Sequence, residues 1–155
     1  MQNWGKNRPL QGRNKENQGG SVAQTKKLKL KSDKPSRRRL IKKLDAVFSK
    51  RIRTRDKWIC QRCRKQHKKN SQGLHCSHYW HRADMGTRWE DDNCIALCYG
   101  CHRRWEGDKQ GEYLDFMMDK LGEQRYNCLK VRAKGIVKFS VSDLEILLKD
   151  LQCPD

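Results

Sequence analysis

The chain has 155 residues and a formal net charge of +18, because 36 Lys and Arg outnumber 18 Asp and Glu. Hydrophobic residues make up only 35% of it, too few for one large core, and no apolar run approaches the roughly 18–20 residues of a membrane span. The N-terminus lacks the apolar segment of a secretory signal, so we expect a small cytoplasmic protein that is neither secreted nor membrane-bound.

Residues 1–36 are rich in Gln, Asn, Lys and Gly, and their few apolar residues follow no period. Such a segment cannot bury enough apolar surface to offset the entropy of ordering, so we predict a disordered basic arm. Residues 1–50 carry 15 Lys and Arg against three acidic residues, which favours nucleic acid as the partner and predicts a salt-dependent affinity. The alternative is a solvated tail without a binding role.

Residues 37–58 are predicted to form an amphipathic helix with a basic outer face. Apolar residues recur there at helical spacing, at Leu40, Ile41, Leu44, Val47, Phe48 and Ile52. We expect the helix to pack on the domain and also to lay basic side chains along a phosphate backbone, since the two roles are compatible. The candidate phosphate contacts at its start are Arg37, Arg38 and Arg39.

Two Cys-x2-Cys pairs, Cys60 with Cys63 and Cys98 with Cys101, frame the middle of the chain. Each pair places two thiols on one tight turn, and two such turns complete a tetrahedral zinc site. We therefore predict structural Zn²⁺, which would supply folding energy that so small a core lacks and would leave no open position for catalysis. The other cysteines have no matching spacing and are interpreted as small buried residues, namely Cys76, Cys94, Cys128 and Cys153.

The reactive side chains lie between or just after the cysteine pairs, within residues 59–110. Residues 74–79 are predicted to form a short strand that leads into an exit loop, and residues 102–105 are predicted to be helical. Three positions stand out in this frame: His78 near the end of the strand, Asn93 before the second cysteine pair, and His102 directly after it.

In these positions, and in the spacing from Asn93 through Cys98 and Cys101 to His102, the sequence resembles the zinc-bearing branch of the HNH (ββα-metal) endonucleases. It is similar in particular to the phage NinG (Rap) recombination endonucleases, through segments 44–50, 75–79, 92–94, 98–101 and 137–140. The likeness spans about residues 40–151. It implies a small α+β fold with a ββα-metal HNH core and a four-cysteine zinc site, flanked by helices.

The resemblance also implies a role for each of the three positions. His78 would be the general base, because a neutral imidazole can deprotonate the attacking water. His102 would be a ligand of a catalytic divalent ion, Mg²⁺ or Mn²⁺, which neutralises charge on the phosphate. Asn93 would fix the loop and orient the base through hydrogen bonds.

One departure from the family is Ser77, which stands where an acidic metal ligand usually precedes the base. The expected replacement is His75, two residues back on the same face of the strand, with His81 and Asp84 as alternatives on the exit loop. Coordination rich in imidazole would suit Mn²⁺ or another transition ion better than Mg²⁺.

Arginines and aromatic residues surround the predicted site. The arginines are candidates for clamping phosphates through paired hydrogen bonds, and they are Arg82, Arg88, Arg103 and Arg104. The aromatic residues are expected either to stack on unpaired bases or to build the core around the zinc, and they are Tyr79, Trp80, Trp89 and Trp105. The core role is the favoured one for Trp89 and Trp105.

Residues 111–155 are predicted to form helices at 112–121 and 123–134, each followed by a glycine, and a final helix that runs to Leu151. A capping box of Ser142 with Glu145 is predicted at the start of the last helix. The first helix is too acidic for a DNA-binding face. We expect these helices either to complete the core or to form a homodimer interface.

The leading hypothesis is a metal-dependent endonuclease that hydrolyses DNA phosphodiester bonds. A preference for branched DNA, such as a Holliday junction or D-loop in bacteriophage recombination within the host cytoplasm, is implied by the resemblance alone. One alternative is a non-catalytic zinc-ribbon DNA-binding protein. Another is a nicking or homing-type HNH nuclease, and the residues themselves leave RNA open as a substrate.

Overall fold

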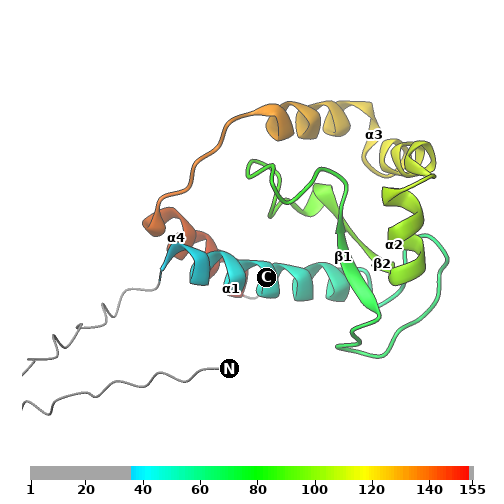
Figure 1. Ribbon diagram of the computed structural model, residues 1–155, viewed down its shortest axis with the longest axis horizontal. Helices are drawn as coiled ribbons and strands as arrows, with labels where there is room; N and C mark the ends of the chain where they lie inside the picture. The colour runs from blue at the N-terminus through cyan, green and yellow to red at the C-terminus, as the bar shows by residue number, and fades with distance from the viewer. Residues whose placement is uncertain (1–35, 154–155) are drawn as a thin grey trace, which may run out of the picture. The chain divides into compact units, whose positions relative to one another are not determined.

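The structure, a computed structural model, describes residues 36–153, which form four helices and a two-stranded antiparallel sheet (Figure 1). This is the small α+β architecture that the sequence predicts. The arm predicted to be disordered lies outside the described residues, apart from Ser36. No helix in the described part of the chain is long and apolar enough to cross a membrane.

Helix α1, Arg37–Arg55, is the predicted basic amphipathic helix. It buries one residue per turn, because apolar side chains recur every four residues along one face, at Leu40, Leu44, Phe48 and Ile52. The helix stops short of the predicted end at residue 58, since Lys57 and Trp58 adopt left-handed backbone conformations with φ of 52° and 60°. Trp58 is buried in the hydrophobic core that follows this turn.

The remaining helices are α2, Tyr99–Glu106, α3, Gln110–Lys134, and α4, Val141–Gln152. The two helices predicted at 112–121 and 123–134 are the two segments of α3, which bends at Gly122 with a φ of 73°. Helix α4 packs on α1 around the fully buried Leu144, so it completes the core, which is one of the two expected roles. The homodimer interface stays a prediction.

The capping box of α4 is formed by Ser140 and Asp143, so the prediction of Ser142 with Glu145 is wrong by two residues. The Ser140 hydroxyl accepts a hydrogen bond from the Asp143 backbone N–H at 3.2 Å, and the Asp143 carboxylate accepts one from the Ser140 N–H at 2.8 Å. Both serines are followed by an acidic residue three positions later, Asp143 for Ser140 and Glu145 for Ser142, so the sequence offers two capping boxes. The helix therefore begins two residues earlier than predicted, at Val141.

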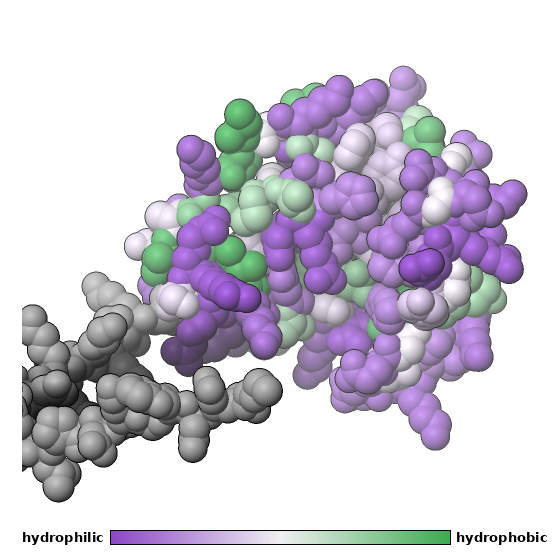
Figure 2. Space-filling model, viewed as in Figure 1, coloured by the Kyte–Doolittle hydropathy of each residue, from purple (hydrophilic) through white to green (hydrophobic). Residues whose placement is uncertain are grey.

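Strands β1, Leu74–His78, and β2, Cys94–Cys98, pair with Leu74 opposite Cys98 and His78 opposite Cys94. Two hydrophobic clusters meet at this sheet. Cys76 and Cys94 pack with residues of α1 and α4, whereas Ile95 and Leu97 pack with residues of α2 and α3. The small sheet thus links the two halves of the core, while the face shown in Figure 2 is mostly hydrophilic.

Candidate metal centre and adjacent cavity

The four cysteines of the two predicted pairs come together in one cluster. Their sulfur atoms all lie within 4.8 Å of one another, and the sulfurs of Cys63 and Cys98 are 3.8 Å apart. Ligand sulfurs on a tetrahedral zinc ion are separated by about 3.8 Å, given a zinc–sulfur bond of about 2.3 Å. The cluster could therefore hold a zinc ion, as the sequence predicts for Cys60, Cys63, Cys98 and Cys101.

Each pair owes its geometry to local backbone structure. After Cys60 the chain reverses, because the Arg64 N–H bonds to the Cys60 carbonyl at 2.9 Å and Arg64 takes a φ of 60°. The second pair occupies the N-terminal turn of α2, where Cys98 is the N-cap residue. Residues three apart on a helical turn lie on the same side, which brings the Cys98 and Cys101 thiols together.

The surroundings of the cluster favour thiolate at one ligand. Burial acts to raise the pKa of Cys60, but hydrogen bonds from backbone N–H groups outweigh it and lower that pKa to about 7. Burial raises the pKa of Cys101, even though the Arg62 guanidinium lies 3.9 Å from its sulfur. Four crowded thiols cannot all ionise together unless a cation offsets their charge, and a zinc dication supplies that.

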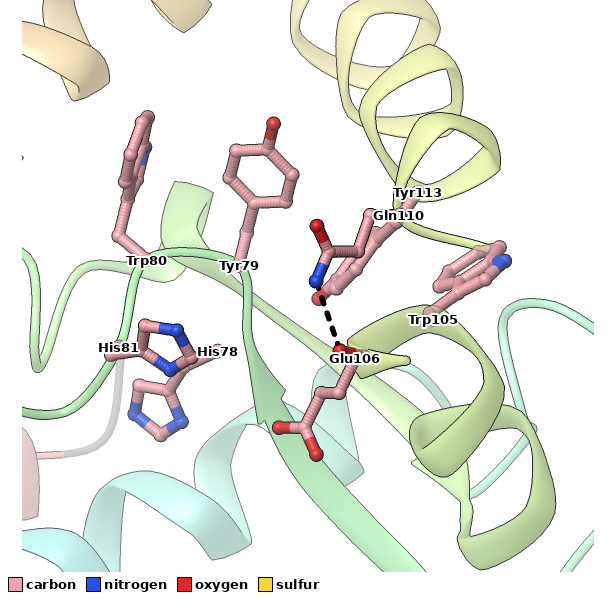
Figure 3. A pocket seen from close by; sticks show the side chains of 8 residues that line it. All are labelled: His78, Tyr79, Trp80, His81, Trp105, Glu106, Gln110 and Tyr113. Atoms are coloured by element: carbon pink, nitrogen blue, oxygen red, sulfur yellow. Dashed lines mark hydrogen bonds between the residues drawn. The ribbon is translucent and has the colours of Figure 1, made fainter. Parts of the chain in front are cut away.

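A separate cavity of about 320 Å³ brings together residues from β1, the loop after it and α2. It contains both histidines that the sequence analysis placed in the catalytic frame. Its lining residues are Cys76, His78, His81, Arg82, His102 and Glu106. A second cavity, of about 210 Å³, shares three of these side chains and continues toward the start of α3 (Figure 3).

His78 ends β1 and is held by the loop that follows. Its Nε2 lies 3.0 Å from the Arg88 carbonyl oxygen, to which a neutral imidazole donates its N–H. Burial, and next the nearby charge of Arg82, lower the pKa of His78 to about 4. The imidazole is therefore neutral near pH 7, with one nitrogen engaged by Arg88 and the other able to accept a proton.

Asn93 is fully buried and joins the two ends of the loop between the strands. Its side-chain oxygen accepts from the Trp80 backbone N–H at 2.8 Å, and its amide nitrogen donates to the carbonyls of Trp80 and Thr87 at 3.0 and 2.9 Å. These three bonds fix the loop that carries Arg88 and hence the carbonyl that holds His78. These hydrogen bonds match the expectation that Asn93 fixes the loop, and its part in orienting a catalytic base stays a prediction.

His102 faces the cavity together with an acidic residue that the sequence analysis missed. The Nε2 of His102 lies 2.9 Å from a carboxylate oxygen of Glu106, one helical turn later on α2. The rings of His75 and His102 are 5.5 Å apart between centroids, so the expected ligand pair is brought close. Burial lowers the pKa of His102 despite the opposing charge of Glu106.

The alternatives to His75 are placed differently from one another. His81 lines the cavity beside His78, whereas Asp84 does not belong to its lining. Ser77, at the position of the usual acid, is fully buried and its hydroxyl lies 3.2 Å from the Tyr113 hydroxyl. It therefore points into the core. The i, i+4 spacing of His102 and Glu106 was the signal that could have identified Glu106 from the sequence.

The predicted phosphate-binding arginines differ in their exposure and in their contacts. Arg82 lines the cavity, and Arg103 and Arg104 are exposed on α2. The side-chain nitrogens of Arg88, in contrast, donate to the Asp45 carboxylate at 2.9 and 2.7 Å and to the Arg82 carbonyl at 2.6 Å. Arg88 thus has a structural role in the described residues, and its phosphate contact stays a prediction. The basic start of α1 is exposed at Arg37, Arg38 and Arg39.

The aromatic residues also divide between cavity and core. Tyr79 and Trp80 line the second cavity with Trp105, whose ring stacks on Tyr113 at a centroid distance of 4.5 Å (Figure 3). Trp105 is only 2% exposed, so it belongs to the core as well. Trp89 is buried, as its favoured interpretation predicted, but it lies in the hydrophobic cluster formed with α1 and α4 and not in the one that contains Cys60 and Cys101.

Comparison with family models, with curated proteins and with solved structures found no match to this chain.

Proposed function

We propose that the protein is a metal-dependent HNH-type endonuclease that hydrolyses DNA phosphodiester bonds. The observation that carries the proposal is the single cavity lined by His78 from β1 and His102 from α2. A strand, an antiparallel strand and a helix follow one another here as β1, β2 and α2, which is the order expected of a ββα-metal core. Asn93, between the histidines in sequence, holds the loop that connects the strands.

His78 has the properties needed to deprotonate a water molecule. Its imidazole is neutral, and the Arg88 carbonyl orients it by accepting one N–H. The other nitrogen can then take a proton from water as it attacks the phosphorus. A pKa of about 4 in the free protein makes His78 a weak base. The negative charge of a bound phosphate would raise that pKa and so strengthen the base.

We further propose that a divalent metal ion binds beside His78, where the described residues supply two close ligands rather than a compact group of three. His102 and Glu106 offer an imidazole nitrogen and a carboxylate oxygen, with His75 nearby. Such mixed ligands suit Mn²⁺ or another transition ion at least as well as Mg²⁺. Bound there, the ion would neutralise charge on the phosphate and the leaving oxygen. In this proposal Glu106 supplies the acid that is missing at Ser77.

DNA is the proposed substrate, and two surfaces support it. Arg82 at the cavity and the exposed Arg103 and Arg104 beside it can bind phosphates. The second cavity is lined by His78 and by aromatic side chains, including Tyr79 and Trp80, whose rings point away from the His78 ring (Figure 3). Aromatic rings stack on unpaired bases, which favours branched or partly single-stranded DNA over a uniform duplex. The role in phage recombination is inferred from the family resemblance.

The test compares cleavage of matched duplex, flap, D-loop and four-way-junction DNA by the full chain with Mg²⁺ and with Mn²⁺. We expect cleavage by wild type and a loss of at least about 100-fold in His78→Ala, since general base catalysis contributes on that order. His67→Ala is the matched control, because His67 lines neither cavity. Zinc content and circular dichroism establish that both variants are folded.

The rival function, a non-catalytic zinc-ribbon DNA-binding protein, would use the same cysteine cluster and basic residues. It predicts that wild type binds these DNAs but cuts none with either ion. Cleavage that persists in a folded His78→Ala variant would instead overturn the assignment of the base. Matched RNA substrates added to the panel test the remaining alternative, since a preference for RNA would replace the substrate and keep the chemistry.

A further inference from the structure

A second group of metal-binding side chains lies beneath the proposed base. The sulfurs of Cys76 and Cys94 and one nitrogen of His78 all lie within 4.8 Å of one another. The register of the sheet causes this, because His78 pairs directly with Cys94 and Cys76 lies two residues before His78 on β1. The three side chains therefore share one face of the sheet, the face that packs against α1.

The geometry is close to what a tetrahedral zinc ion requires. Zinc bonds of about 2.3 Å to sulfur and about 2.0 Å to nitrogen place ligand atoms roughly 3.6–3.8 Å apart. The three atoms are within about 1 Å of that spacing, which side-chain rotation can supply. Two thiolates and an imidazole prefer Zn²⁺ and similar thiophilic ions, whereas Mg²⁺ and Mn²⁺ prefer oxygen-rich sites.

The site is also accessible from the proposed catalytic cavity. Cys76 and His78 both line that cavity, while Cys94 does not belong to its lining and is fully buried. An ion that enters the cavity would therefore first meet two of the ligands, Cys76 and His78. Once it is bound by all three ligands, its fourth coordination position would face the water in the cavity. This arrangement differs from the closed four-cysteine cluster, whose ligands come from other parts of the chain.

We propose that Cys76, His78 and Cys94 form an inhibitory site for a thiophilic divalent ion, Zn²⁺ in the first instance. A metal-bound imidazole nitrogen has no lone pair left for a proton, so occupation of the site removes the base from catalysis. The binding itself is independent of the proposed function, whereas the inhibitory effect rests on it. The same chain would then use a hard ion for cleavage and be switched off by a soft one.

The first experiment measures metal binding without any DNA. Full-length protein is equilibrated with Zn²⁺, freed of unbound metal by gel filtration, and analysed for zinc per chain. We expect about two zinc ions for wild type and about one for Cys76→Ser and for Cys94→Ala. Cys128→Ala is the matched control and should keep two, because Cys128 is exposed and belongs to neither cluster.

Cobalt gives a second readout that reports the ligands. Co²⁺ added to protein that carries one zinc ion per chain, in the four-cysteine cluster, should produce thiolate-to-cobalt charge-transfer absorption in wild type and in Cys128→Ala. The absorption should be absent from both Cys76→Ser and Cys94→Ala. One zinc ion per wild-type chain, or two in a folded variant of either cysteine, would overturn the site.

Cleavage then tests the inhibitory effect. At a Zn²⁺ concentration ten times the half-saturating value, wild-type cleavage should fall about tenfold by mass action, and cleavage by Cys94→Ala should change less than about twofold. Equal inhibition of both would place the inhibitory zinc at His102 and Glu106 and refute this role for Cys94. If zinc binds as expected but no chain cuts DNA, the metal site stands and the proposed endonuclease function fails.

Discussion

Two regions of this protein are rich in metal-binding side chains, and they differ in how their ligands are assembled. The four-cysteine cluster draws identical ligands from two short turns, and each pair is brought together by local backbone structure. The cavity brings together side chains of different kinds that could bind a metal ion, from β1, the following loop and α2. A set of four thiolates closes around zinc and stabilises the fold, whereas a mixed and partly open set leaves room for substrate and water.

The two regions are nonetheless joined at one point in the chain. Cys101 and His102 are consecutive residues in the first half of α2. Metal binding by Cys98 and Cys101 would anchor the turn from which His102 projects into the cavity. The difference between the regions therefore predicts an asymmetry: damage to the cysteine cluster should disturb the cavity, whereas changes in the cavity should leave the cluster intact.

The largest effect is expected from removal of the cysteine cluster. Cys101→Ala or a strong chelator should abolish most of the stability, because structural zinc contributes about 10 kcal/mol in small domains. Denaturant titration with parallel zinc analysis measures the loss. His102→Ala should keep its zinc and lose less than about 2 kcal/mol. Equal loss of stability in both variants would remove the distinction between the two regions.

Asn93→Ala should have the next largest effect, within the cavity's own framework. It leaves one backbone N–H and two carbonyls of the loop without their partner in a buried setting, at a cost of about 4 kcal/mol. Zinc content should be unchanged. Asn127→Ala, on an exposed part of α3, is the matched control and should cost less than about 0.5 kcal/mol. A fully stable Asn93→Ala variant would show that other contacts fix the loop.

The low pKa of His78 predicts a pH dependence of stability that involves the cavity. The unfolded chain binds the proton near the ordinary pKa of 6.5, and the folded chain binds it only near pH 4. The contribution of His78 to stability is thus complete above pH 6.5 and declines as pH falls toward 4, by up to about 1.4 kcal/mol per pH unit. Denaturation curves of wild type and His78→Gln between these pH values measure the difference. A slope unchanged in His78→Gln would contradict the burial of a neutral imidazole.

The cysteine cluster could be predicted from the sequence because the spacing of its ligands within each pair is local. Two ligands within four residues fix most of the geometry of each pair, and only the meeting of the two pairs depends on the fold. The start of α4 is also local, yet it was misplaced. Ser140 and Ser142 offer competing N-caps in the sequence. The ring of Phe139, directly before Ser140, lies 5.7 Å from that of Trp89 between centroids, and no local sequence pattern indicates this contact.

The cavity could be predicted only in part, because its contacts join distant segments. His78, Asn93 and His102 were identified through spacing and family resemblance. Glu106 was missed. Its i, i+4 spacing from His102 shows only that the two side chains lie on one side of α2, whereas the fact that this side faces the cavity depends on how α2 packs against β1. Arg88 was assigned to phosphate, but a carboxylate 43 residues earlier in the chain occupies its guanidinium. Nothing in the local sequence reveals that pairing.

That pairing gives the smallest and most specific prediction. Asp45 accepts hydrogen bonds from Arg88 and from the Trp89 indole at 3.0 Å. Burial acts to raise the pKa of Asp45, but these bonds and the Arg88 charge outweigh it and hold the pKa below its usual range. Asp45→Asn should therefore cost about 2 kcal/mol near pH 7, where the carboxylate is ionised, because it weakens a half-buried ion pair.

The consequence of Asp45→Asn for the cavity follows from the loop. The Arg88 side chain ties the loop to α1, and the Arg88 carbonyl orients His78. Loosening the first contact should disorder the second, so cleavage should slow more than the loss of stability alone explains, while zinc content stays unchanged. Asp115→Asn, exposed on α3, is the control for both measurements. If cleavage is unaffected by Asp45→Asn, His78 is held by the loop itself, through Asn93, without help from α1.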